Sequence, residues 1–173
     1  LNDLNNKENL KIELNPPYQR GNVWSLQQKS NLIDSIIKGY APSSLIFNQI
    51  DGVKRCIDGK QRCTTLIEYT KNKFPYMVQE SEEVTTYYFY GPKNENIPTT
   101  TKQKYPSLKL LDGDTKVEFD NTQIPVTLYK NLAYIEEIDL FKRLQCGEKL
   151  TQGELLASGL EDSEKITVLN QIG

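Results

Sequence analysis

The strongest chemical signal in the sequence is the five-residue motif Asp58-Gly59-Lys60-Gln61-Arg62. It lies between a predicted strand over residues 53–57 and a predicted helix over residues 58–71. A helix N-terminus presents free backbone N–H groups and the positive end of the helix dipole, and it therefore favours phosphate. The motif thus predicts a phosphate-binding turn between a strand and a helix.

Each residue type in this motif has a chemical reason to be there. Gly59 allows the backbone to come close to a ligand. Lys60 supplies a point charge and Arg62 a planar fork for phosphate oxygens. Asp58 can hold a divalent cation or position a water molecule. The alternative is that Asp58 only caps the helix and that both cations are solvated.

Two further stretches pair aromatic or apolar residues with arginine. Tyr18-Gln19-Arg20, followed by Trp24, can stack on a base and bind phosphate. Arg143 follows a predicted inward residue, Phe141, and can reach a central site. The alternatives are that Tyr18 and Trp24 are core residues, and that Arg143 is an exposed cation near a helix C-terminus, where the dipole favours it.

The numbers of cysteine and histidine residues exclude several classes of functional site. Cys56, Cys63 and Cys146 are too few for a disulfide framework, which indicates a reducing compartment. Cys63 lies near a helix start beside Arg62, a position that favours a reactive thiol, and the alternative is a small buried residue. The chain contains no histidine, which excludes Ser-His and Cys-His catalysis, His-ligated metals and an HNH nuclease centre. We therefore predict no resident metal site formed by the protein alone.

Charge is unevenly distributed along the 173 residues. The net charge is −2, but residues 1–73 hold 11 Lys and Arg against 7 Asp and Glu, whereas residues 74–173 hold 10 against 16. An anionic partner is therefore expected to meet the first part of the chain. No apolar run approaches the ~20 residues that cross a bilayer, so no membrane association is expected.

Hydrophobic periodicity predicts the elements that position these residues. Strands are predicted at residues 10–14, 44–50, 53–57, 84–90, 116–119 and 123–129, and an Asp51-Gly52 turn joins two of them. Helices are predicted at residues 25–40, 58–71 and 134–145, after Thr151 and near Ser163. The first begins with a capping box at residues 25–28 and has an apolar stripe that ends at Tyr40. In the third, Ile135, Ile138, Phe141 and Leu144 are predicted to point inward. Residues 91–111 contain three prolines and are interpreted as an irregular insertion. The predicted fold class is α+β, a small mixed sheet with helices followed by a helical C-terminal section.

The motifs, in this order, resemble the N-terminal domain family of GmrSD restriction endonucleases, whose fold is similar to ParB and sulfiredoxin. The family pattern of a strand, Asp-Gly-Gln-Gln-Arg and a Leu-Thr-Thr-Leu helix is matched by residues 57–66. Its Tyr-Gln-Arg…Trp element and Leu-Ile-Asp-Ser-Ile helix are matched by residues 18–24 and 32–36. Its later Phe-x-Arg-Leu element is matched from Phe141 to Glu154. Residues 1–173 are then a single domain of this type, expected to be part of a longer protein.

The resemblance implies a site that binds a nucleoside triphosphate with Mg²⁺. Its binding residues are Tyr18, Gln19, Arg20, Gly59, Lys60, Arg62 and Arg143, and its catalytic residues are Asp58, Gln61 and Arg62. Lys60 stands where the family has glutamine, and Gln145 where it has asparagine. Lys60 keeps the attraction for phosphate but removes an amide that can orient water, so binding is a firmer expectation than hydrolysis.

The resemblance also implies partners and leaves alternatives open. DNA and a C-terminal nuclease or effector domain are the expected partners, in a cytoplasmic or otherwise intracellular setting, or in the nucleus if the source is eukaryotic or viral. A second reading is a ParB-like DNA-binding or scaffolding module with a degenerate nucleotide site. A third is a sulfiredoxin-like redox enzyme that uses Cys63.

Overall fold

A computed structural model of the chain describes residues 11–17, 24–91, 99–105, 107–145 and 165–166. By its contacts the chain divides into two units, each built from separate stretches of sequence. Unit 1 comprises residues 1–22, 41–60 and 123–173, and unit 2 comprises residues 23–40 and 61–122. Each unit is described by itself.

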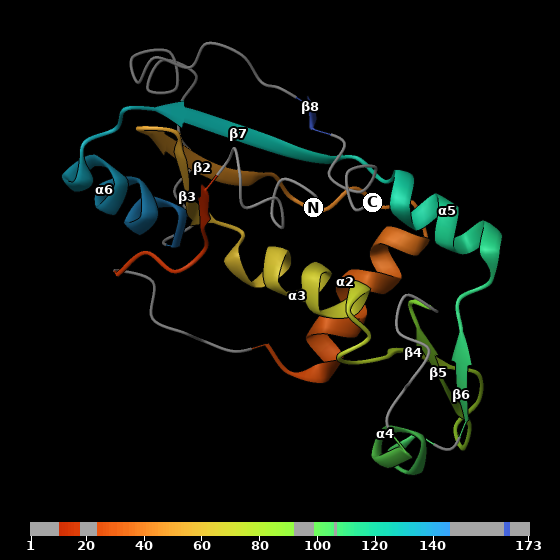
Figure 1. Ribbon diagram of the computed structural model, residues 1–173. Coiled ribbons are helices and arrows are strands. Elements are labelled where there is room, and N and C mark those ends of the chain that lie inside the picture. The colour runs from red at the N-terminus through yellow and green to blue at the C-terminus, as the bar shows by residue number, and fades with distance from the viewer. Residues whose placement is uncertain (1–10, 18–23, 92–98, 106, 146–164, 167–173) are drawn as a thin grey trace. The chain divides into compact units, whose positions relative to one another are not determined.

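Unit 1 is organised around a five-stranded mixed sheet. Its strands are β1 (Lys11–Glu13), β2 (Leu45–Ile50), β3 (Val53–Asp58), β7 (Ile124–Lys130) and β8 (Lys165–Ile166), in the order β1-β3-β2-β7-β8. β2 and β3 are antiparallel, whereas β1 runs parallel to β3 and β7 runs parallel to β2, as Figure 1 shows. The sheet is therefore mixed, as predicted.

The β2–β3 hairpin has the turn that its sequence predicts. Asp51 and Gly52 both have positive φ angles, 49° and 75°. Two successive positive φ values give a turn whose twist matches that of the flanking strands, and Asp-Gly is a favoured pair for it. The turn fixes the register in which Ile50 pairs with Val53.

Helix α6 (Tyr134–Gln145) contacts β3 and contributes to the core of unit 1. That core includes Ile57, Tyr129, Leu132 and Leu140. The prediction that Ile135 points inward is wrong, because its side chain is 70% exposed. The buried residue of the first turn is instead Glu137.

Unit 2 contains helix α2 (Leu26–Ile37) and most of helix α3 (Lys60–Thr70). The predicted capping box of α2 is present: the Gln28 N–H donates to the Ser25 hydroxyl (3.3 Å) and the Ser25 N–H donates to the Gln28 side chain (2.9 Å). The apolar stripe of α2 ends earlier than predicted, since Tyr40 is 65% exposed.

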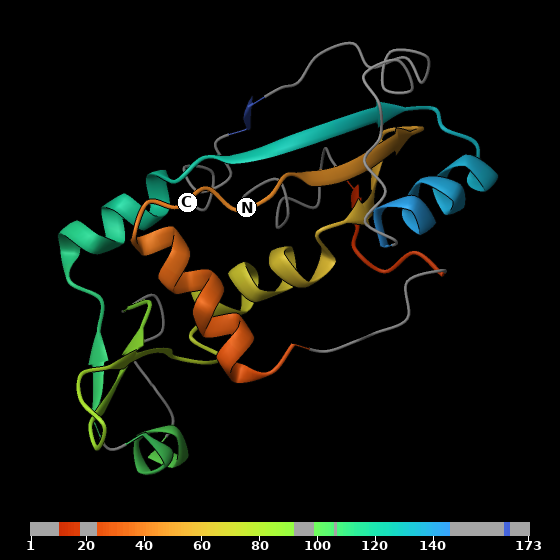
Figure 2. The same ribbon diagram turned by 180° about the vertical axis from the view of Figure 1, so that it is seen from behind.

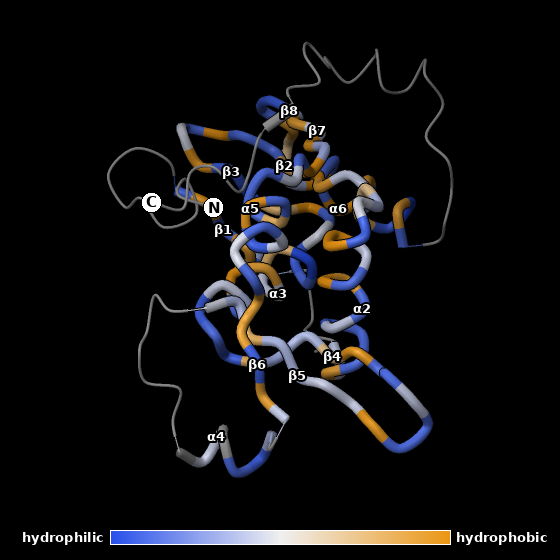
Figure 3. Tube along the Cα trace, turned by 90° about the vertical axis from the view of Figure 1, so that its right-hand side faces the viewer, coloured by the Kyte–Doolittle hydropathy of each residue, from blue (hydrophilic) through white to orange (hydrophobic). Residues whose placement is uncertain are grey.

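The rest of unit 2 is a three-stranded sheet with two short helices. The strands β4 (Tyr76–Gln79), β5 (Thr85–Phe89) and β6 (Leu108–Leu110) lie in that order in the sheet. In the chain, α4 (Thr99–Lys104) precedes β6 and α5 (Gly113–Asn121) follows it. Helix α2 contacts both β4 and α5 (Figure 2). Helix α4 contains only threonine, lysine and glutamine and is hydrophilic throughout (Figure 3).

An aromatic cluster fills the core of unit 2. Tyr69 of α3 is fully buried, and its ring centroid lies 5.6 Å from that of Phe74, 6.0 Å from that of Tyr90 and 5.5 Å from that of Phe119. Burial raises the pKa of the Tyr69 hydroxyl. Edge-on and tilted aromatic pairs of this kind add stabilisation beyond the area they bury.

Three predicted elements differ from the structure. Residues 116–119 were predicted as a strand but form part of α5, which is capped by Asp112 through the Thr115 N–H (2.9 Å). The described part of residues 91–111 is not irregular, since it contains α4 and β6. Lys165 and Ile166 form β8 on β7, where a helix was predicted. Residues 151–164, which include the other predicted C-terminal helix, lie outside the described residues.

None of the helices in the described part of the chain is both long and apolar enough to span a bilayer.

Candidate functional site

Asp58 is the last residue of β3 and Lys60 is the first residue of α3. The predicted helix therefore begins two residues later than expected. Asp58 is not in the N-cap position, because its backbone remains in the sheet as the partner of Ile46 on β2. The predicted order of strand, turn and helix is confirmed, and the turn consists of the single residue Gly59.

The backbone of this turn is suited to an anion. Gly59 is buried and has a φ angle of 98°, which side-chain-bearing residues rarely adopt. The backbone N–H groups in the first turn of a helix have no intrahelical partner. Lys60 and Arg62 stand in that first turn, which contains no acidic residue. Backbone dipoles and side-chain charge therefore have the same sign at the start of α3.

Gln61 connects the start of α3 to a second predicted motif within unit 2. Its side-chain oxygen accepts a hydrogen bond from the Trp24 backbone N–H at 3.4 Å. The sequence predicted that these two motifs serve one site, and this bond brings one residue of each together. The bond also gives Gln61 an anchoring role that its sequence position alone does not indicate.

The remaining predicted binding residues are only partly described. Tyr18, Gln19 and Arg20 lie outside the described residues. Arg143 stands in the last turn of α6, where its Nε donates to the Asp139 carboxylate at 2.9 Å, and its side chain is 41% exposed. The dipole of α6 favours a cation at this end, so the helix itself stabilises Arg143 there.

The structure contradicts the redox interpretation of Cys63. That interpretation needs an accessible thiol, whereas Cys63 is a free cysteine with only 2% exposure. Cys56 is also free and fully buried, and its thiol donates to the Asp58 carbonyl at 3.3 Å. Cys146 lies outside the described residues.

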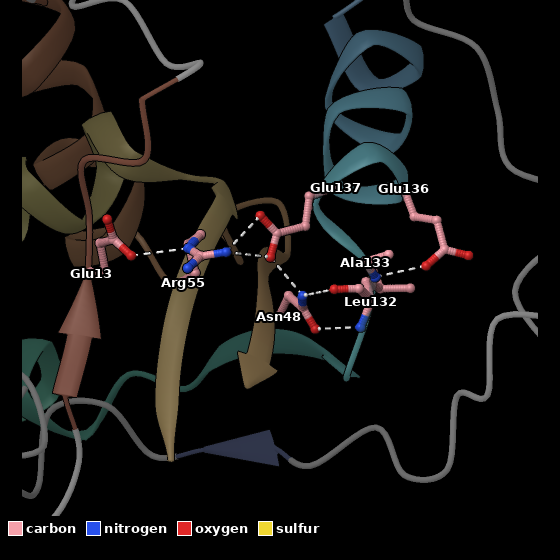
Figure 4. Close-up of polar contacts among 7 residues, drawn as sticks. All are labelled: Glu13, Asn48, Arg55, Leu132, Ala133, Glu136 and Glu137. Carbon is pink, nitrogen blue, oxygen red and sulfur yellow. Dashed lines mark hydrogen bonds and ion pairs between the residues drawn. The ribbon is translucent and has the colours of Figure 1, made fainter. Parts of the chain in front are cut away.

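Sequence reasoning missed a polar network in unit 1, drawn in Figure 4. Glu137 is fully buried, and both of its carboxylate oxygens accept from Arg55 Nη1, at 3.0 and 3.1 Å. The Asn48 amide donates to Glu137 at 2.6 Å, and Arg55 Nε donates to Glu13 at 2.9 Å. Hydrogen bonds to Glu13 and then Glu137 raise the pKa of Arg55.

No local signal in the sequence reveals this network. Glu137 follows Glu136 in the first turn of α6, where acidic residues are expected on dipole grounds alone and are usually solvated. Arg55 and Glu137 are 82 residues apart in the chain. In the part of the chain that the structure describes, no three Asp, Glu or Cys residues are grouped so that they could hold a metal ion.

Comparison with known proteins identifies a family. The model of the GmrSD restriction endonuclease N-terminal domain family matches residues 1–161. No curated protein and no solved structure matches the chain. The family match covers most of the sequence, including the Asp58–Arg62 turn and Arg143. The chain therefore belongs to the family of GmrSD restriction endonuclease N-terminal domains.

Proposed function

We propose that this domain binds a nucleoside triphosphate with its phosphates at the N-terminus of α3. The observation that carries the proposal is the turn at Gly59, whose φ of 98° leads β3 directly into a helix that begins with Lys60 and lacks acidic residues in its first turn. Arrangements of this kind attract phosphate because N–H groups, dipole and cations act together.

The remaining roles follow from side-chain chemistry. Lys60 and Arg62 neutralise phosphate charge, and Tyr18, Gln19, Arg20 and Arg143 are the proposed further contacts. Mg²⁺ usually binds through one or two carboxylates together with substrate phosphates and waters. Asp58, beside the turn, is a donor of this type and would hold the ion once the triphosphate is bound.

Hydrolysis is the finer part of the proposal. Asp58 and Gln61 would position the attacking water, and Arg62 would stabilise charge that develops on the phosphoryl group. Family membership supports a role in restriction-type DNA defence, in which a bound or hydrolysed nucleotide would permit DNA processing by another domain. Binding without phosphate release would instead favour a scaffolding module with a degenerate site.

The test is the affinity of Arg62 variants for ATP and GTP with Mg²⁺, measured by calorimetry beside the melting temperature. Charge-assisted hydrogen bonds contribute roughly 1.5–3 kcal/mol each, so Arg62→Ala should weaken binding by about one to two orders of magnitude. Arg62→Lys should recover only part of this, because an ammonium lacks the planar fork. Phosphate release by the wild type and by Asp58→Asn reports on hydrolysis.

A matched control separates phosphate binding from general electrostatics. Lys130→Ala removes one positive charge from an exposed residue at the end of β7, and it should leave the affinity within about twofold. If Arg62 has a structural role, Arg62→Ala should instead lower the melting temperature of the protein in the absence of nucleotide. Glu68, one candidate partner for such a role, binds Lys29 Nζ at 2.6 Å. Unchanged affinity in Arg62→Ala would refute the proposal.

A further inference from the structure

Three polar residues form a row across unit 1. Glu13 of β1 and Asn48 of β2 are the direct register partners of Arg55 on β3, one on each side. Residues opposite one another in neighbouring strands project from the same face of a sheet. Arg55 and Asn48 bind Glu137 of α6, and Arg55 also binds Glu13, as Figure 4 shows.

Arg55 donates hydrogen bonds to two different carboxylates. Its Nε donates to Glu13 and its Nη1 donates to both oxygens of Glu137, at 2.9, 3.0 and 3.1 Å. Asn48 completes the arrangement by donating to Glu137 at 2.6 Å and to the Leu132 carbonyl at 3.0 Å, and by accepting from the Leu132 N–H at 3.1 Å. Arg55 thus joins β1, β3 and α6, and Asn48 fixes the segment that leads into α6.

Two of these elements carry predicted site residues. Asp58, three residues after Arg55, is the last residue of β3, and Arg143, six residues after Glu137, lies in the last turn of α6. We propose that Arg55 is a positioning residue that holds β1, β3 and α6 in register and thereby positions Asp58 and Arg143. The nucleotide arm of its test rests on the proposed function, whereas the structural arm does not.

Physical chemistry explains why the position needs arginine. A fully buried carboxylate such as Glu137 is costly unless it is paired and hydrogen-bonded. A guanidinium presents donors on two edges of one rigid plane, so it can bind Glu13 and Glu137 at once. A lysine at position 55 has a single nitrogen at the end of a flexible stem, and it would neutralise charge without fixing the angle between β1 and α6.

The structural arm measures hydrogen–deuterium exchange in Arg55→Gln and Arg55→Lys. Amide exchange should accelerate about tenfold or more in both β1 and α6, because each segment loses the same anchor. Lys29→Gln is the matched control, since it breaks the 2.6 Å ion pair with Glu68 in unit 2. The control should leave exchange in β1 and α6 unchanged. The inference is overturned if only one of the two segments responds, or if β5 of unit 2 accelerates equally.

The second arm separates positioning from stability with the double variant Arg55→Met/Glu137→Leu. Apolar replacement of a buried ion pair often preserves stability, and Asn48 keeps its two bonds to Leu132. The double variant should melt close to the wild type yet bind ATP with Mg²⁺ about tenfold or more weakly. Wild-type affinity in this variant would overturn the positioning role. A wild-type protein that binds no nucleotide would refute the proposed function instead, and the exchange measurement would still decide on Arg55.

Discussion

At the scale of single residues, the hydroxyl of Thr65 is a source of instability. Thr65 lies in α3 and is fully buried, and among the described residues its Oγ1 is the one buried side-chain oxygen or nitrogen without a hydrogen-bond partner. Threonine in a helix usually bonds a carbonyl in the preceding turn. A buried polar group that lacks a partner costs about 1–3 kcal/mol.

Thr65→Val should therefore stabilise the protein. The substitution keeps the shape of the side chain and removes only the unpaired hydroxyl, and the two residues have similar helix propensities. We expect the free energy of unfolding, measured by urea denaturation, to rise by about 1 kcal/mol. Thr64→Val in the same helix controls for propensity, since Thr64 is only partly buried. A loss of stability in Thr65→Val would show that the hydroxyl has a partner, such as an ordered water.

At the scale of elements, a carboxylate ties α2 to β4. Asp34 accepts from Lys38 Nζ at 2.7 Å and from the Tyr76 hydroxyl at 2.7 Å. Partial burial acts to raise the pKa of Asp34, but the bonds from Lys38 and Tyr76 outweigh it and hold this pKa below its ordinary 3.8. Burial and the bond to Asp34 also raise the pKa of Tyr76.

The lowered pKa makes the contribution of Asp34 depend on pH. A carboxyl group that binds its proton less readily in the folded state stabilises the fold above its unfolded pKa, and this is lost as pH falls through the folded value. Asp34→Asn should therefore destabilise the protein near neutral pH, and its difference from the wild type should shrink as pH falls from about 5 to below 3. Urea midpoints over this range measure the difference.

The control for this pH series is Asp51→Asn, which makes the same change of charge in an exposed turn. Asn tolerates the positive φ of 49° found at Asp51. If the difference between wild type and Asp34→Asn stays constant across the range, the bonds to Lys38 and Tyr76 do not act through the ionised carboxylate.

The sequence predicted those elements whose signals are local. The capping box at Ser25 and the Asp51-Gly52 turn depend on residues a few positions apart, and both are confirmed. Residues 116–119 were wrongly predicted as a strand because Val117 and Phe119 alternate with charged residues. In the structure Asp112 caps a helix that buries Phe119 and leaves Val117 58% exposed. Strand β4 was not predicted, because it is stabilised by pairing with β5 and the sequence of β4 alone does not indicate that pairing.

The same division applies to the candidate site. The contiguous motif from Asp58 to Arg62 was found from its residue types, and its place between a strand and a helix is confirmed. The bond from Trp24 to Gln61 and the pairing of Arg55 with Glu137 join residues 37 and 82 positions apart. Contacts at such distances are set by the fold, and a single sequence does not reveal them.

At the scale of the whole molecule, composition limits what the domain can do to DNA. The chain has no histidine to act as a base or metal ligand, and its net charge is −2. We expect that the domain alone does not cut DNA efficiently. Plasmid cleavage with Mg²⁺ or Mn²⁺, in the presence and absence of ATP, measures this. Robust cutting that Asp58→Ala abolishes would contradict the expectation and would make the domain itself a nuclease.

The order of the two units along the chain has a mechanical consequence. The chain passes from one unit to the other after residues 22, 40, 60 and 122, and the first and last described strands, β1 and β8, belong to unit 1. Tension applied through β1 and β8 would be carried by the hydrogen-bonded ladders of the unit 1 sheet, and unit 2 would bear no load until those ladders rupture. Because each unit is built from separate stretches of the chain, no single backbone cut separates one unit from the other. A chain cut once by a protease should therefore migrate as a single species in size-exclusion chromatography until denaturant separates the fragments.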